Sequence, residues 1–250
     1  EKIPSHLRNG RNPVLDFNKR IIDATAPFAV AYKPNLAFYE QAGARGWEML
    51  KKTFDYIPEG ILKIADGKRG DIGNTSGRYA EACFEQLGAD AVTINPYMGK
   101  DAVEPFLEGG TGRWGILLAL TSNTGADDFE LQKLYNGHML YEEVIERSKA
   151  WGTPDKLMYV VGATRPEAIA GIRKMVPKHF LLVPGVGAQG GNLEKVALFG
   201  MNEDCGLIVN ASRSIIYAGD GPGFAEKAAV EAEKLQKQMA EMLRKHSFIQ

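Results

Sequence analysis

The sequence has few cysteines, few histidines and no long apolar run. Its two cysteines, Cys83 and Cys205, lie far apart among 250 residues, whereas small secreted scaffolds carry many closely spaced cysteines. This scarcity indicates a reducing, cytoplasmic environment. No stretch reaches the roughly 20 apolar residues that a transmembrane helix needs, and the first residues do not resemble a signal peptide. We therefore expect a cytoplasmic protein with no membrane partner.

The charge balance and the histidine content exclude two further kinds of partner. Basic and acidic residues nearly cancel, at a formal net charge of −1, whereas binding the phosphates of a nucleic acid requires a clustered basic excess. The four histidines include no pair with the spacing of metal ligands. The sequence therefore predicts neither a nucleic-acid partner nor a metal site. The histidines are His6, His138, His179 and His246.

Short apolar runs alternate with helical segments along the chain. The runs are rich in aliphatic and β-branched residues, as expected for strands buried on both faces of a parallel sheet. The seven predicted strands are Phe28–Lys33, Ile61–Ala65, Ala91–Asn95, Gly115–Leu120, Leu157–Val161, Phe180–Val183 and Leu207–Asn210. The predicted helices include Pro13–Ala24, Leu36–Phe54, Thr75–Leu87, Leu140–Trp151, Pro166–Met175, Asn192–Phe199 and a long helix from about Gly223 to Lys245.

This alternation indicates a parallel sheet built from right-handed crossovers. A closed (β/α)8 barrel has eight strands, one more than predicted here, and the helix Pro13–Ala24 has no strand before it. No linker rich in proline and glycine divides the chain. We therefore expect one domain over residues 1–250, an α/β fold of the (β/α)8 TIM-barrel class whose first strand lies upstream of Glu1. An open, doubly wound sheet is the alternative.

One strand end carries the strongest chemical signal. The strand Ile61–Ala65 continues into Asp66, Lys68 and Asp71, and active sites of barrels lie at this C-terminal rim. Because residues two apart on a strand share a face, Asp66 and Lys68 are expected to point the same way. Lys33, at the end of the preceding strand, completes an alternating array of charges in which the carboxylates favour a protonated Lys68. A purely structural cluster of ion pairs is the alternative.

A glycine-rich segment, Pro184–Gly191, follows the predicted strand Phe180–Val183 and precedes a helix. Its Gly-x-Gly-x-x-Gly pattern is not a dinucleotide fingerprint, because that motif belongs to the first strand of a Rossmann fold, with an acidic residue about 20 positions later. Backbone amides at a helix N-terminus bind phosphate, and barrels commonly bind phosphate after strands seven and eight. Ser212 and Arg213 would complete such a site, since arginine binds phosphate in bidentate fashion.

A polar stretch, Thr121–Asn123, follows the predicted strand Gly115–Leu120. Its hydroxyl and amide groups, including that of Ser122, could contact a polar ring. They could equally form an ordinary polar turn, for which these residue types are common.

Together these segments resemble the orotidine 5′-monophosphate decarboxylase family, and the likeness covers nearly the whole chain. The Gly-Ala-Gln-Gly-Gly loop and the Val-Gly-Ala-Thr strand are similar to its second, bacterial-type subgroup. The first strand of the family ends in an aspartate that binds ribose, and this sequence has no counterpart to it. The segments that carry the resemblance are Ala31–Asn35, Asp66–Thr75, Asn95–Gly99, Thr121–Ala126, Val160–Thr164, Pro184–Gly191 and Ser212–Ile215.

The resemblance implies conversion of orotidine 5′-monophosphate to UMP and CO2 without a cofactor, in the last step of de novo UMP synthesis. It implies a Lys-Asp-Lys-Asp array with Lys68 as the proton donor, and a homodimer whose sites are completed across the interface. The matching catalytic residues are Lys33, Asp66, Lys68 and Asp71, and the matching substrate-binding residues are Ile72, Thr75, Ser122, Pro184, Gln189 and Arg213. Among these, Asp71, Ile72 and Thr75 match residues that reach the partner's site, Ser122 a pyrimidine contact, and Gln189 and Arg213 phosphate ligands.

Two alternatives remain open. Mg²⁺-dependent decarboxylases and aldolases of keto-sugar phosphates, in the same superfamily, share Asp-x-Lys-x-x-Asp but have an acidic residue where this chain has Lys33. The second alternative is a barrel that binds a phosphate ligand without catalysis.

Overall fold

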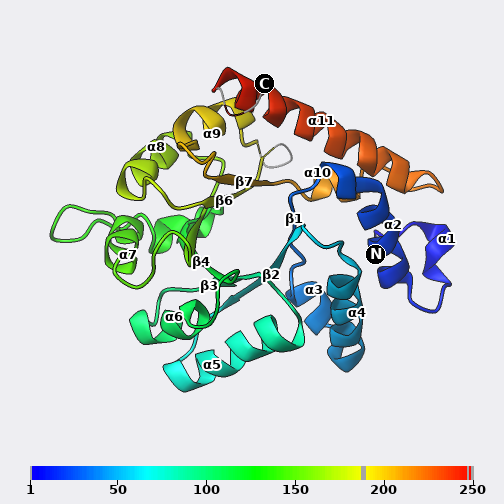
Figure 1. Cartoon of the computed structure of the whole chain (residues 1–250), viewed down its shortest axis with the longest axis horizontal. Coiled ribbons are helices and arrows are strands. Elements are labelled where there is room, and N and C mark those ends of the chain that lie inside the picture. The colour runs from blue at the N-terminus through cyan, green and yellow to red at the C-terminus, as the bar shows by residue number, and fades with distance from the viewer. Residues whose placement is uncertain (1, 187–189, 247, 249–250) are drawn as a thin grey trace. The chain divides into compact units, whose positions relative to one another are not determined.

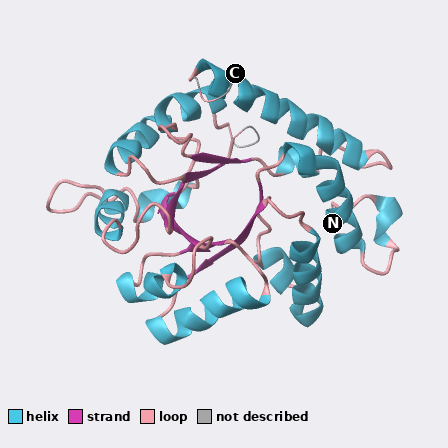
Figure 2. Cartoon of the chain, viewed as in Figure 1, coloured by secondary structure: helices cyan, strands magenta, loops and turns pink. Residues whose placement is uncertain are grey.

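The structure, a computed structural model, describes residues 2–186, 190–246 and 248. The chain forms two compact units, in both of which strands and helices alternate (Figures 1 and 2). The first unit contains Glu1–Asp66, Leu87–Ala89 and Ala211–Gln250, and the second contains Gly67–Gln86 and Asp90–Asn210.

Seven strands lie in the described part of the chain, close to where the apolar runs predict them. They are β1 (Ala31–Tyr32), β2 (Leu62–Arg69), β3 (Ala91–Ile94), β4 (Trp114–Leu120), β5 (Leu157–Val161), β6 (Leu181–Pro184) and β7 (Leu207–Asn210). The α-helices are α1 (Ser5–Arg8), α2 (Pro13–Thr25), α3 (Ala37–Glu40), α4 (Gly43–Tyr56), α5 (Gly73–Glu81), α6 (Lys100–Leu107), α7 (Leu140–Ser148), α8 (Pro166–Met175), α9 (Leu193–Gly200), α10 (Arg213–Ile216) and α11 (Phe224–Lys245). The shorter 3-10 or π segments are η1 (Ala26–Phe28), η2 (Ala82–Gln86) and η3 (Thr124–Asp128).

In the first unit, β1 and β2 run parallel, with Ala31 opposite Leu62. Two backbone hydrogen bonds continue this pairing past the end of β1. The Asp66 N–H donates to the Pro34 carbonyl at 3.1 Å, and the Leu36 N–H donates to the Asp66 carbonyl at 3.2 Å. The chain around Pro34 is therefore held beside Asp66, at the C-terminal end of the strand pair.

The interior of the first unit joins segments from the two ends of the chain. Helix α2 packs against α11 (Figure 1), and the rings of Phe17 and Phe224 stack with centroids 5.1 Å apart. The buried residues of this cluster are Leu7, Phe17, Ile21, Phe224 and Ala228.

In the second unit, the strands from β3 to β7 each pair in parallel with the next. The end of β2 joins them, since the Asn95 N–H donates to the Arg69 carbonyl at 2.7 Å. All residues of β3 and of β5 are buried, as expected for strands covered on both faces. The predicted parallel arrangement of strands and helices is thereby confirmed. Among the helices that the structure describes, none combines the length and the hydrophobicity of a membrane-spanning segment.

Glycine and proline shift several element boundaries from the predicted ones. The predicted helix Leu36–Phe54 is two helices, because Gly43 takes a φ of 61° and starts a new helix there, a backbone conformation that glycine adopts at low cost. The predicted strand Phe28–Lys33 is shorter, since its first residue ends a 3-10 turn that contains Pro27. These boundaries follow local backbone chemistry that hydrophobic periodicity does not record.

A buried cation holds together several turns of the second unit. Arg173, in α8, donates hydrogen bonds to the carbonyls of Gly200 (2.7 Å), Val176 (2.9 Å), His179 (2.7 Å) and Gly206 (2.9 Å). Burial lowers the pKa of the Arg173 guanidinium to about 10. Burial, followed by the positive charge of Arg173, also lowers the pKa of the His179 imidazole below its ordinary value of 6.5.

His179 should make the stability of the protein depend on pH. The unfolded chain binds a proton that the buried imidazole resists, so the free energy of unfolding should decrease as the pH falls below about 6.5. Urea unfolding between about pH 8 and about pH 5 measures this slope. His179→Phe should flatten the slope, whereas His246→Phe, at an exposed position, should keep it. An equal slope in His179→Phe and wild type would show that His179 is not its source.

Candidate active site

Lys33 and Asp66 form a close ion pair in the first unit. Lys33 Nζ lies 2.5 Å from Asp66 Oδ2, and the two side chains are only 13% and 6% exposed. Asn35 Nδ2 lies 3.4 Å from the same oxygen. The parallel pairing of β1 with β2 brings these groups together across 33 positions of sequence. A carboxylate this buried needs a charged partner, and Lys33 supplies it.

Lys68 has an unusual backbone conformation. Its φ is 46°, in the left-handed region, which residues with a Cβ rarely occupy and which is concentrated at functional sites. The Lys68 N–H donates to Thr93 Oγ1 at 2.9 Å, and Thr93 is only 1% exposed. The Lys68 side chain itself is exposed. Because β2 departs from regular strand geometry here, alternation alone does not determine the direction of Lys68, and its placement beside Asp66 stays a prediction.

Asp71 lies in a turn that is closed by hydrogen bonds. Its Oδ1 accepts the Ile72 N–H at 2.8 Å, and its carbonyl accepts the hydroxyl of the buried Ser76 at 2.8 Å. Helix α5 begins directly after this turn, with Thr75 in its first turn. Ile72 is 59% exposed. The turn therefore presents Asp71, Ile72 and Thr75 from one short, internally bonded segment of the second unit.

Ser122 follows the end of β4 and is half-buried. A Cβ added to Gly162, just after β5, would lie 2.8 Å from Ser122 N, closer than real contacts allow. The backbone of Ser122 is therefore seated directly against the chain at Gly162. The preceding residue, Thr121, donates its N–H to the carboxylate of Glu130 at 2.7 Å. Sequence reasoning missed both Gly162 and Glu130 as supports of Ser122, because neither contact belongs to a local motif.

The described ends of the glycine-rich segment after β6 lie close together. Pro184 pairs with Asn210 in the sheet, and the Gly191 N–H donates to the Gly185 carbonyl at 3.2 Å. A Cβ added to Gly191 would lie 2.7 Å from that carbonyl oxygen, so this position requires glycine. Gln189, a predicted phosphate ligand, lies outside the described residues.

Arg213 is the first residue of α10 in the first unit, and its side chain is exposed. An exposed guanidinium can bind a phosphate, to which it donates hydrogen bonds, without losing an internal ion pair. A contact between Arg213 and a phosphate held by the Pro184–Gly191 loop stays a prediction. Among the residues that the structure describes, no three His, Cys, Asp or Glu side chains gather in a way that could hold a metal ion.

Comparisons with known proteins agree with this architecture. The chain is 55% identical over 246 residues to the orotidine 5'-phosphate decarboxylase of Phocaeicola vulgatus, covering 97% of this chain and 90% of the relative. It is 57% identical over 249 residues to the enzyme of the same name from Christiangramia forsetii, covering 98% and 90%.

A solved structure shares the fold. The OMP decarboxylase of Leishmania donovani matches with a TM-score of 0.78 and 36% identity, over 89% of this chain and 87% of that one. This likeness confirms the α/β barrel class predicted from the strand pattern. The profile of the Orotidine 5'-phosphate decarboxylase / HUMPS family matches residues 14–228. By this match, and by the identity to its curated members, the chain belongs to the orotidine 5'-phosphate decarboxylase / HUMPS family.

Proposed function

We propose that this chain decarboxylates orotidine 5′-monophosphate to UMP and CO2 without a cofactor, in the last step of de novo UMP synthesis. The observation that carries the proposal is the identity of 55% and 57%, over nearly the whole chain, to orotidine 5'-phosphate decarboxylases. The buried Lys33–Asp66 pair supports it, because the charge array implied by the resemblance requires these two residues in contact. The scarcity of cysteine supports a cytoplasmic location for the reaction.

The proposed chemistry needs a cation at the reacting carbon. The bond from C6 of the pyrimidine to the carboxylate breaks, CO2 leaves, and the electron pair stays on C6. The Lys68 ammonium stabilises this pair and then donates its proton to C6, which gives UMP and a neutral amine that solvent reprotonates. Asp66 and Asp71 hold the ammonium in place. The strained φ of 46° at Lys68 supports a functional role, because such strain is retained where function needs it.

Binding of the phosphate supplies energy far from the reacting carbon. In the proposal, Gln189 and Arg213 bind the phosphate, Pro184 contacts the substrate, and Ser122 contacts the pyrimidine. Energy from such remote contacts can close a loop over the site and accelerate the chemical step. The glycines of the Pro184–Gly191 segment support an anion-binding loop, because glycine lets backbone amides approach an anion closely.

A second candidate follows from the family description, which also names the HUMPS group. The Mg²⁺-dependent keto-sugar-phosphate enzymes considered above have an acidic residue at the position of Lys33. In this chain the Lys33 ammonium neutralises Asp66 at 2.5 Å, so a lysine stands at the position where the magnesium-dependent pattern requires an acid. The contact therefore favours the decarboxylase.

The proposal includes a homodimer in which Asp71, Ile72 and Thr75 complete the partner's site. Large apolar side chains are exposed close to this turn and to the end of β3, among them Ile72 at 59% and Tyr97 at 81%. Exposed apolar groups that cluster beside polar ones are typical of interfaces between proteins. A second copy of the chain would cover them.

One assay tests the proposed function. The purified protein, incubated with orotidine 5′-monophosphate, should convert it to UMP. The decrease in the absorbance of orotidine 5′-monophosphate follows the reaction, and chromatography confirms the product. Adding EDTA should not change the rate, which separates this enzyme from the magnesium-dependent candidate. Binding of the nucleotide with no release of CO2 would contradict the proposal and favour a non-catalytic barrel.

A further inference from the structure

Thr121 and Ser122 lie past the end of β4, beyond its backbone pairing with β5. The last hydrogen bond of the ladder is made by the Leu120 carbonyl, which accepts the Gly162 N–H at 2.8 Å. Thr121 and Ser122 come directly after it and lie outside the strand. A residue that must contact a substrate within a few tenths of an ångström requires another support here.

Glu130 supplies this support from nine positions later in the chain. Its Oε2 accepts the Thr121 N–H at 2.7 Å, and its Oε1 lies 2.8 Å from Thr121 Oγ1. Hydrogen bonds to an ionised carboxylate are roughly twice as strong as those between neutral groups. The hydroxyl has one proton, which it donates either to Glu130 or to Asn123 Oδ1 at 2.6 Å. The bond from the Thr121 backbone N–H to Glu130 does not depend on which acceptor the hydroxyl takes.

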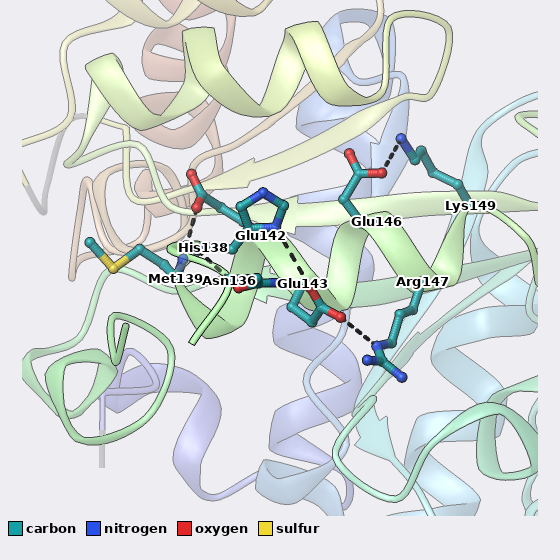
Figure 3. Close-up of polar contacts among 8 residues, drawn as sticks. All are labelled: Asn136, His138, Met139, Glu142, Glu143, Glu146, Arg147 and Lys149. Atoms are coloured by element: carbon teal, nitrogen blue, oxygen red, sulfur yellow. Dashed lines mark hydrogen bonds and ion pairs between the residues drawn. The ribbon is translucent and has the colours of Figure 1, made fainter. Parts of the chain in front are cut away.

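Glu130 is itself anchored at the start of α7. Its carbonyl accepts the Tyr141 N–H at 3.0 Å. Figure 3 shows how this helix start is built: the Glu142 carboxylate, in the first turn of α7, accepts the N–H of the N-cap residue Met139 at 2.8 Å. The Glu130 carboxylate therefore links the end of β4 to a helix whose first turn is fixed by its own hydrogen bonds.

Gly162 supports the other side of Ser122. A Cβ at position 162 would lie 2.8 Å from Ser122 N, 2.9 Å from Ser122 Cβ and 3.0 Å from Ser122 Cα. The Ser122 backbone thus rests on the bare backbone of Gly162, while Glu130 holds the residue before it. The bond from Thr121 to Glu130 and the contact with Gly162 therefore both restrict the backbone at Ser122.

We propose that Glu130 is a positioning residue, which holds Ser122 where it meets the pyrimidine through its carboxylate bond to Thr121 without touching the substrate. The inference rests on the proposed function, because the pyrimidine contact of Ser122 comes from the family resemblance. Preorganised side chains reduce the cost of ordering the site, and a displacement of about 1 Å can lower a rate by about 10²-fold.

A double-mutant cycle with Ser122 tests this role. Glu130→Ala should lower kcat/KM for orotidine 5′-monophosphate by about 10- to 100-fold. In a Ser122→Ala background the same change should have almost no further effect, because the two residues act through one contact. Glu130→Gln keeps a carbonyl oxygen for the Thr121 N–H and should retain most of the activity. If Glu130→Ala does not fold, Glu130→Gln serves in the cycle, and its smaller loss should likewise vanish in the Ser122→Ala background.

Glu143→Ala is the matched control. This carboxylate lies at the same junction of loop and helix, where it accepts hydrogen bonds from Asn136 at 2.9 Å and from Arg147 at 2.7 Å (Figure 3). Its removal should lower the melting temperature slightly and leave kcat/KM unchanged. An active wild type in which Glu130→Ala has wild-type kcat/KM, or in which the Glu130 and Ser122 effects multiply, would overturn the inference alone. An inactive wild type would overturn the proposed function, and this inference with it.

Discussion

Lys68→Ala should lower the rate of decarboxylation by about 10⁴-fold or more, because two contributions are lost together. In the proposed mechanism, the ammonium both stabilises the charge that develops on C6 and supplies the proton. General acid catalysis typically contributes about 10²- to 10⁴-fold, and a preorganised charge at the reacting atom contributes about 10²- to 10³-fold.

The fold should tolerate this substitution. Alanine also has a Cβ, so the backbone strain at φ 46° is the same in both proteins, and the bond from the backbone N–H at position 68 to Thr93 Oγ1 does not involve the side chain. Calorimetry should therefore still detect binding of UMP. Lys63→Ala, five positions earlier on β2, is the matched control and should keep its turnover. Near-normal turnover in Lys68→Ala would contradict the proposed mechanism.

Asp71→Asn should abolish most activity in a pure dimer, and hybrid dimers should recover it. Asparagine keeps the Oδ1 that accepts the Ile72 N–H at 2.8 Å, so the turn should persist while the negative charge is lost. Lys68 and Asp71 are proposed to act in different subunits' sites. A dimer that pairs one Lys68→Ala chain with one Asp71→Asn chain then contains one intact site of two. It should show about half the wild-type activity, as two-fold symmetry requires.

Differently tagged chains, expressed together and purified on both tags, provide these hybrids. The control pairs Lys68→Ala with Lys33→Ala. Because both of these residues are proposed to serve the site of their own subunit, neither site of that hybrid would be intact and no activity should return. If activity returned in both hybrid dimers, or in neither, the proposed sharing of each active site between two subunits would be excluded. A protein that sediments as a monomer at the assay concentration would exclude it as well.

Much of the architecture could be predicted from the sequence, because it depends on local patterns. Runs of aliphatic residues such as Leu157–Val161 are buried at every position, and the same burial requirement generates the pattern in the sequence. Lys33 and Asp66 were identified for a similar reason, since Lys33 ends one predicted strand and Asp66 follows another. Element boundaries were less predictable: Gly43 divides one predicted helix into two, a break that hydrophobic periodicity did not predict.

The roles of individual residues stay predictions to different degrees. The contact between Lys33 and Asp66 is present in the structure, whereas the partners of Ser122, Thr75 and Arg213 in a substrate complex stay predictions. Gln189 lies outside the described residues. Glu130 had no signal in the sequence, because a carboxylate in a loop is ordinary until its partner is known.

The sequence by itself determined the alternation of parallel strands and helices, the position of the charged strand end and the likeness to one family. Hydrophobic periodicity and short motifs are local, so they can be read along the chain. Only the tertiary structure decided that Lys33 neutralises Asp66, that Lys68 takes a left-handed conformation against Thr93, and that Glu130 reaches back to Thr121. These contacts join positions nine to 33 apart in the sequence, and they depend on strand register and packing, which no local pattern records.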